Sequence, residues 1–256
     1  MAMAFRGCTR WTHSCLFLSL VALISCEGDQ PTVPLDPNYP TTISALEPAE
    51  LLVRKQIFAE RNPQICSSLD KFGLTWGDCG EGPALGTQDT AELIEEAKRT
   101  LVGNSDFTGV MSPDELHVEE VYRGNSIMID FAIQTYSELP VEMTWIRVWM
   151  DSLGVRSIRG YHFPEIRVPK SVLTSTQAQA SLIGLEIPWA DLEGEHVHTV
   201  EQKDFSEAPV KVVFPKHSSD NIELHLAWRV PVTEMWWVFV DAVTGEQVGM
   251  WRWVIF

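Results

Sequence analysis

The feature that most constrains the fold is a strict two-residue period near the C-terminal end of the chain. Every second position from 222 to 232 is apolar: Ile222, Leu224, Leu226, Trp228, Val230 and Val232. Successive side chains of a β-strand point to opposite faces, so this pattern predicts a strand with one buried face. The chain must therefore build a sheet.

The same period recurs in other parts of the chain and is interrupted by turns. Apolar side chains recur at every second position over 127–133 and 146–150. A further strand over 237–241 leads into the turn at 244–245, and a closing strand is expected over 248–256. Residues 151–154 and 244–245 have the composition of hairpin turns. These strands are therefore expected to pair in antiparallel order.

Three other stretches predict helices. Ser44 can cap a helix that runs to Phe58, and Asp89 followed by Glu92 has the spacing of a capping box before a second helix. A third helix is expected over residues 174–184, where Ser and Thr can cap. Helices interspersed with antiparallel strands predict an α+β fold, with helices against one face of a sheet.

The N-terminal residues have the three parts of an export signal. Arg6 and Arg10 precede an apolar run over residues 16–24, which ends in a small residue and Cys26. Leu-Ile-Ser-Cys at residues 23–26 resembles a lipobox, whose cysteine is acylated and becomes the first residue of the mature protein. An uncleaved anchor is the alternative, but the run is shorter than the roughly 20 residues that span a bilayer. We therefore expect a lipid-anchored protein of the bacterial cell envelope that faces the periplasm or the exterior.

The charge of the mature chain excludes one class of partner. Cleavage removes Arg6 and Arg10 and no acidic residue, so the formal net charge at pH 7 moves from −16 to −18. Such an acidic chain is repelled by phosphates, so nucleic acid is not an expected partner.

Two cysteines remain for a disulfide if Cys26 is acylated. Cys66 and Cys79 border a polar, Gly-rich loop, and exported proteins occupy compartments where disulfides form. We predict that they pair. Two buried free thiols are the alternative, and a metal site is disfavoured because no histidine lies near them in sequence.

Two groups of motifs resemble a known family. Residues 131–141 (Phe-Ala-Ile-Gln-Thr-Tyr-Ser-Glu-Leu-Pro-Val) and the hairpin at 151–160 resemble the fungalysin/thermolysin propeptide. Residues 226–230 (Leu-Ala-Trp-Arg-Val) and 240–246 (Val-Asp-Ala-Val-Thr-Gly-Glu) resemble the PepSY module that completes such propeptides. The resemblance spans residues 115–249.

This resemblance implies two cystatin-like lobes, each a curved antiparallel sheet with a helix. In secreted thermolysin-like proteases, such a propeptide helps the catalytic domain to fold and covers its active-site cleft. The expected organisation is a signal peptide (1–25), a Pro-rich solvated tether (26–43), a helical region (44–110), a propeptide-like lobe (111–184) and a PepSY-like lobe (185–256).

The sequence offers no position for catalysis. It contains no His-Glu-x-x-His, Gly-x-Ser-x-Gly, Walker or dinucleotide motif, so we expect neither an enzyme nor a cofactor. His196 and His198 would lie on one side of an extended segment, which makes a divalent metal conceivable. A solvated loop is the favoured interpretation, since no spacing fixes a third ligand.

Tryptophans gather in the last strands, at Trp236, Trp237, Trp251 and Trp253. Neighbouring residues of a strand point to opposite faces, so at least one of these rings should lie away from the main core. Burial beneath another part of the chain is the ordinary interpretation, because aromatic side chains dominate cores. The alternative is a surface that binds a protein partner.

Three functional hypotheses follow. The first is a non-enzymatic envelope lipoprotein that binds a protein partner and inhibits or chaperones a secreted metalloprotease in trans. The second is a structural or ligand-binding lipoprotein with no connection to proteases. The third is a metal-dependent activity at His196 and His198, for which the sequence argues least.

Overall fold

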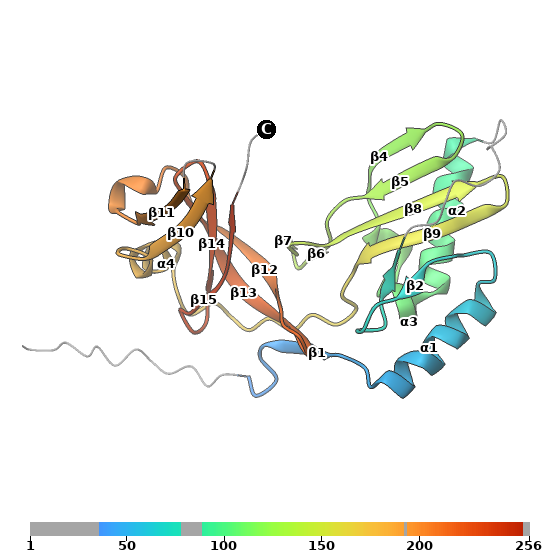
Figure 1. Cartoon of the computed structure of the whole chain (residues 1–256), viewed down its shortest axis with the longest axis horizontal. Coiled ribbons are helices and arrows are strands. Elements are labelled where there is room, and N and C mark those ends of the chain that lie inside the picture. The colour runs from blue at the N-terminus through green and yellow to red at the C-terminus, as the bar shows by residue number, and fades with distance from the viewer. Residues whose placement is uncertain (1–35, 78–88, 192–193, 253–256) are drawn as a thin grey trace, which may run out of the picture. The chain divides into compact units, whose positions relative to one another are not determined.

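Antiparallel sheets organise the structure, a computed structural model that describes residues 36–77, 89–191 and 194–252. These residues belong to one compact unit, Leu35–Phe256. Within the described ranges the strands form five sheets, of which one has four strands and one has five. Figure 1 shows these two larger sheets and the helices beside them.

The four-stranded sheet has the order β4-β5-β8-β9. Its strands are β4 (Val118–Arg123), β5 (Ile127–Phe131), β8 (Trp145–Asp151) and β9 (Gly154–Tyr161). Alternation buries Ile127, Ile129 and Phe131 on one face of β5, where they share a core with side chains of three helices. These helices are α1 (Pro48–Arg61), α2 (Thr90–Gly103) and α3 (Ser105–Thr108).

The five-stranded sheet is centred on β13 (Asn221–Val232), the long strand predicted from the apolar alternation over residues 222–232. The strands β1 (Thr41–Ser44), β12 (Val210–His217) and β14 (Trp236–Asp241) all pair with it, and β15 (Gln247–Arg252) pairs with β14. Helix α4 (Ser175–Ser181) packs on one face through Ala178, in a core with Val230 and Val238.

Shorter elements complete the described structure. They are the hairpins β2 (Ser68–Leu69) with β3 (Thr75–Trp76), β6 (Thr135–Tyr136) with β7 (Leu139–Pro140), and β10 (Glu186–Asp191) with β11 (Gly194–Thr199), and the 3-10 helices η1 (Pro113–Glu115) and η2 (Gln202–Asp204).

The α+β fold expected from the sequence is confirmed, and two of the helix starts are the predicted ones. Asp89 accepts a hydrogen bond from the backbone N–H of Ala91 at the start of α2. Thr174 and Gln177 form a reciprocal capping box at the start of α4. The side chains at these positions accept hydrogen bonds from backbone N–H groups that have no partner within the first turn of a helix.

Two expectations near the start of the described chain are wrong. Ser44 does not cap a helix, because it is the last residue of β1 and lies opposite Asn221 of β13; α1 begins at Pro48. Residues 36–43 belonged to the predicted solvated tether, yet residues 41–43 are a paired strand. The local sequence favours an extended, solvated chain, but pairing with β13, about 180 residues later, overrides this preference. No local pattern signals such a pairing.

The helical region predicted over residues 44–110 does not form a core of its own. Phe58 and Leu101 pack in the same buried cluster as Ile129 and Val148 of the four-stranded sheet. Within the described residues, no helix has the length and apolar character needed to cross a bilayer. The signal peptide and Cys26 lie outside the described residues, so the lipid anchor stays a prediction.

Candidate functional site

The outward face of the four-stranded sheet carries an alternating row of tryptophan and arginine. On β8, Ile146 and Val148 point into the core, so Trp145, Arg147 and Trp149 point to the opposite face. All three are half-buried. Figure 1 shows helix α2 running along the sheet, and its buried side chains lie in the core on the other side.

Neighbouring strands extend this row across the sheet. Arg147 lies opposite Asp130 of β5 and Arg159 of β9, and Trp145 lies opposite Tyr161. Trp149 lies opposite Met128 and Ser157. Side chains directly opposite each other in a sheet are close enough to interact, so this register places charged and aromatic groups in contact.

The guanidinium groups stack on the rings. The central carbon of the Arg147 guanidinium lies 5.7 Å from the ring centre of Trp145 and 5.4 Å from that of Trp149. The same carbon of Arg159 lies 5.6 Å from the Trp145 ring centre and 4.7 Å from that of Trp76, which β3 contributes. These distances are within the range of cation–π attraction. We call Trp76, Trp145, Arg147, Trp149 and Arg159 the Trp–Arg face.

An ion pair fixes the centre of the Trp–Arg face. Arg147 donates from Nε and Nη2 to the two carboxylate oxygens of Asp130, each at 2.5 Å. The exposed fractions of the two side chains are 34% and 17%, so the pair is only partly screened by solvent. A bidentate pair holds the guanidinium plane in one orientation, and the tryptophan rings are held with it.

The chemistry of this face suits binding. Tryptophan supplies a large apolar area with few rotatable bonds, and arginine supplies several N–H donors in a rigid plane. The prediction of a tryptophan surface missed this face. The order Trp-x-Arg-x-Trp within a predicted strand was the signal that could have revealed it.

The tryptophans predicted to bind a partner do not act as one group. Trp236 has an exposed fraction of 6% and packs in the core beneath α4, so its assignment to a surface is wrong. Trp237 and Trp251 lie against a different cluster, with Phe214 and Phe239, and their ring centres are 6.5 Å apart. The expected opposite orientation of Trp236 and Trp237 is thus confirmed. Trp253 lies outside the described residues.

A partly buried charge pair holds Trp237 in place. The Arg229 guanidinium lies 4.6 Å from the Trp237 ring centre and donates to a Glu142 carboxylate oxygen at 2.7 Å. Burial raises the pKa of Glu142, against the lowering effect of Arg229. The second tryptophan cluster is therefore tied into the fold through Arg229 and Glu142.

His196 and His198 lie on one side of the β10–β11 hairpin, as expected, but each has another partner. His198 Nε2 lies 2.9 Å from an Asp204 carboxylate oxygen, and the ring of His196 stacks on Trp189 at 4.3 Å between centres. A hydrogen bond from the backbone N–H of Glu201 is the main cause that lowers the pKa of Asp204. In the parts of the chain that the structure describes, no three His, Cys, Asp or Glu side chains are arranged to hold a metal ion.

The predicted disulfide falls partly outside the described residues. Cys66 follows α1, and its backbone N–H donates to the carbonyl of Arg156 on β9 at 2.9 Å. Cys79 is not described, so the Cys66–Cys79 bond stays a prediction.

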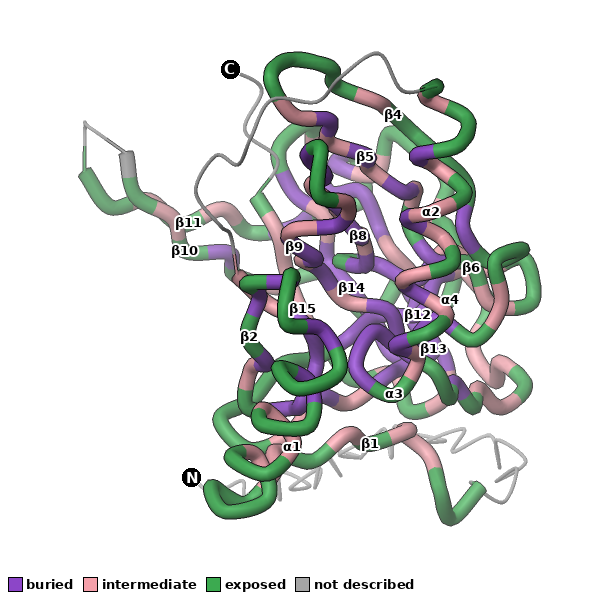
Figure 2. The backbone as a smooth tube through the Cα atoms, turned by 90° about the vertical axis from the view of Figure 1, so that its right-hand side faces the viewer, coloured by how far each residue is buried: buried purple, intermediate pink, exposed green. Residues whose placement is uncertain are grey.

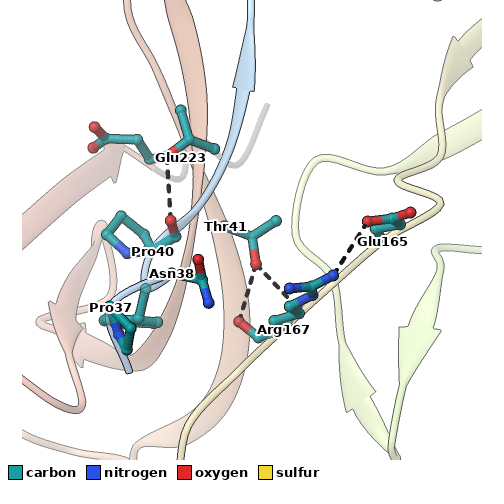
Figure 3. Close-up of a pocket in the computed structure, with 9 residues that line it drawn as sticks. Pro37, Asn38, Pro40, Thr41, Glu165, Arg167 and Glu223 are labelled. Carbon is teal, nitrogen blue, oxygen red and sulfur yellow. Dashed lines mark hydrogen bonds and ion pairs between the residues drawn. The ribbon is translucent and has the colours of Figure 1, made fainter. Parts of the chain in front are cut away.

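A polar hollow lies where β1 enters the sheet (Figure 3). It has a volume of about 480 Å³ and is lined by residues 37–42, Glu165, Arg167 and Glu223. The hydroxyl of Thr41 donates to the Arg167 carbonyl and accepts from the Arg167 N–H, and Arg167 pairs with Glu165 at 3.7 Å. These groups hold two segments of the chain together, so the hollow is better explained as a junction than as a ligand site.

The comparisons with known proteins identify no relative by sequence: no family profile and no curated protein matches the chain. Among solved structures, the chain is similar to the Bacillus megaterium YpeB C-terminal domain, with 13% sequence identity and a TM-score of 0.31. This similarity covers 74% of this chain and 76% of the YpeB domain.

Proposed function

We propose that this protein is a non-enzymatic lipoprotein of the bacterial cell envelope, anchored by acylation of Cys26, that binds a protein partner through the Trp–Arg face. The observation that carries the proposal is the row formed by Trp145, Arg147 and Trp149, which lies on the side of the sheet that the core does not use.

The composition of this face favours a protein partner. Tryptophan and arginine are enriched among the few interface residues that supply most of the binding energy. The Arg147–Asp130 pair already fixes its geometry, so binding does not have to order it. The fold supplies a rigid, partly exposed platform of the kind that protein interfaces use at their centre.

The partner that we propose is a secreted metalloprotease of the thermolysin type, which the protein inhibits or chaperones in trans. The support is the resemblance of residues 115–249 to the propeptide and PepSY modules of such proteases. Those modules act on a catalytic domain by contact, and a folded sheet with a binding face is compatible with that role.

The test compares three forms of the full mature chain as bait in solubilised envelope and culture fluid. The wild-type chain should recover a protein partner, and Trp149→Ala should lose it. Trp251→Ala is the matched control, because it removes a half-buried tryptophan from the other cluster and should keep the partner. Thermal unfolding followed by circular dichroism must show that all three forms fold.

Two results would contradict separate parts of the proposal, namely the binding face and the identity of the partner. If Trp149→Ala recovers the same proteins as the wild-type chain, the Trp–Arg face is not the binding site. If the recovered partner is not a metalloprotease, and the full chain neither inhibits thermolysin in a titration nor speeds its refolding, the connection to metalloproteases is wrong, and a structural or ligand-binding lipoprotein becomes the better description.

A further inference from the structure

Helix α1 is apolar on two sides. Its inner side packs Phe58, which has an exposed fraction of 2%, and Leu51 against the core of the four-stranded sheet. Its outer side carries Leu52, Val53 and Ile57, with exposed fractions of 69%, 58% and 44%. Figure 2 shows α1 mostly as exposed and intermediate residues.

The outer apolar residues have the spacing of a helix face. Ala49, Leu52, Val53 and Ile57, with the polar Gln56 between them, follow the pattern i, i+3, i+4, i+7 and i+8, which places them along one stripe. All five are exposed. A surface helix normally turns such a stripe toward the core and presents polar residues to water. We call these five residues the outer stripe.

We propose that the outer stripe lies on the surface of the lipid bilayer to which the protein is anchored. This inference rests on the proposed acylation of Cys26. A lipid surface accepts apolar side chains at its boundary, and a helix lying in the plane of the interface buries one face there.

The length of the chain brings α1 within reach of the bilayer. Asp36, the first described residue, is ten positions after Cys26, and ten residues of chain span at most about 35 Å. The strand β1 follows, and α1 begins four residues after it ends. Of the helices that the structure describes, α1 is therefore the nearest in sequence to the anchor.

The charges on α1 allow this contact, whereas the charge of the whole chain opposes it. Cleavage before Cys26 leaves the chain with a formal net charge of −18, since it removes Arg6 and Arg10 from a chain of −16, but α1 carries three basic residues (Arg54, Lys55 and Arg61) against Glu50 and Glu60. Arg54 and Lys55 are half-buried, and Arg61 pairs with Asp106 at 2.8 Å. The five residues of the outer stripe are uncharged, so they bring no charge of their own against phosphate headgroups. The stripe ends at Glu60, which accepts a hydrogen bond from the side chain of Gln56.

The outer stripe is too small to bind a bilayer without the attachment at Cys26. Three large apolar side chains are too few to hold a soluble protein on a bilayer, since binding strength grows with the apolar area that is buried. Attachment through Cys26 would keep α1 at a high local concentration near the lipid, so a weak contact becomes occupied. The contact would fix the orientation of the protein on the membrane.

The experiment uses the full acylated chain in vesicles of phosphatidylethanolamine and phosphatidylglycerol. The photoreactive residue p-benzoylphenylalanine replaces Gln56 in the outer stripe or, as a control, Glu119, which is exposed on β4. Mass spectrometry then detects lipid crosslinked to each position. We expect several-fold more lipid adduct at position 56 than at position 119. Adding the exposed substitutions Leu52→Gln and Ile57→Gln should remove the excess while acylation and folding persist.

The other outcomes overturn the inference in separable ways. Equal lipid adducts at the two positions of an acylated, vesicle-bound chain would exclude contact between α1 and the bilayer and leave the anchor intact. Crosslinks from position 56 to a second copy of the chain would show that the stripe is a protein interface. A mass that lacks the acyl group would refute the anchor and, with it, this inference.

Discussion

The phenolic oxygen of Tyr39 lies 2.7 Å from a carboxylate oxygen of Asp241, a residue 202 positions later in the chain. His225 Nδ1 lies 2.7 Å from the same oxygen. The other carboxylate oxygen of Asp241 accepts from the backbone N–H groups of Val243 and Thr244, which shape the turn between β14 and β15. Asp241 therefore joins the segment before β1 to the last hairpin of the sheet.

Replacing Tyr39 by phenylalanine should weaken this junction. The hydroxyl donates to Asp241 and accepts from the backbone N–H of Leu226 at 3.0 Å, so its loss leaves two largely buried groups without that partner. We expect Tyr39→Phe to lower the free energy of unfolding by about 1–3 kcal/mol, as measured by urea denaturation. Tyr122→Phe is the control, because the Tyr122 hydroxyl contacts Glu120 at an exposed site. Equal effects of the two substitutions would contradict the role of the junction.

Acid should weaken the same junction. Burial raises the pKa of Asp241, but hydrogen bonds from His225, Tyr39 and two backbone amides more than offset it, so the pKa lies below its ordinary value of 3.8. A carboxyl group with a lowered pKa stabilises the folded state above its unfolded pKa and loses that contribution as pH falls through the folded pKa. The free energy of unfolding should therefore decrease below about pH 4.

Asp241→Asn provides the control for this pH effect. The variant should be less stable than the wild-type chain at pH 7, and its free energy of unfolding should fall less steeply below pH 4. Urea titrations at a series of pH values measure how the free energy of unfolding of each protein depends on pH. Parallel slopes for the two proteins would assign the acid sensitivity to other carboxyl groups.

Local patterns predicted much of the fold because the local rules and the packing agree. The alternation at Ile127, Ile129 and Phe131 matches the buried face of β5, and Asp89 caps α2 where its side chain can reach an open N–H. Ser44 shows where local rules fail. Its polar side chain suits a helix start, but Ser44 pairs with Asn221 in a strand, and only the folded sheet brings these residues together.

The candidate site was harder to predict for a similar reason. The sequence shows that Trp236 and Trp237 point to opposite faces, but not that α4 covers the Trp236 side. The row Trp145-x-Arg147-x-Trp149 is visible in the sequence, whereas its contacts with Arg159 depend on the register of β8 with β9. Such a face becomes apparent only when the register and the covering elements are known.

Two glycines of contrasting environment test the register of the four-stranded sheet. Gly160 on β9 has a φ of 135°, and a Cβ atom added there would lie 1.8 Å from the Trp145 carbonyl oxygen. Gly160→Ala should therefore lower the free energy of unfolding by more than about 2 kcal/mol. Gly103→Ala, at the end of α2 with no atom within 4 Å of the added Cβ, should raise it by about 0.5–1 kcal/mol. Chemical denaturation measures the free energy of unfolding of both variants. An unchanged value for Gly160→Ala would contradict the close approach of the Gly160 backbone to the Trp145 carbonyl.

The loop that begins at Cys66 is held to β9 at two points, and this arrangement favours the predicted disulfide. The backbone N–H of Cys66 donates to the Arg156 carbonyl, and the Ser157 hydroxyl donates to the carbonyl of Gly77, each at 2.9 Å. The chain at residue 66 and the chain at residue 77 therefore lie against neighbouring residues of one strand, and Cys79 follows Gly77 by only two positions.

Reduction of this bond should have a chemical and a thermodynamic effect. The mass of the purified chain should increase by two hydrogen atoms, and the free energy of unfolding should fall by about 3 kcal/mol, as expected for a closed loop of this length. A Cys66→Ser, Cys79→Ser variant should show the lower stability without reductant and no further change when reductant is added. Alkylation of both cysteines in the folded, unreduced protein would show that they are free thiols. In that case the attachment to β9 alone would hold the loop.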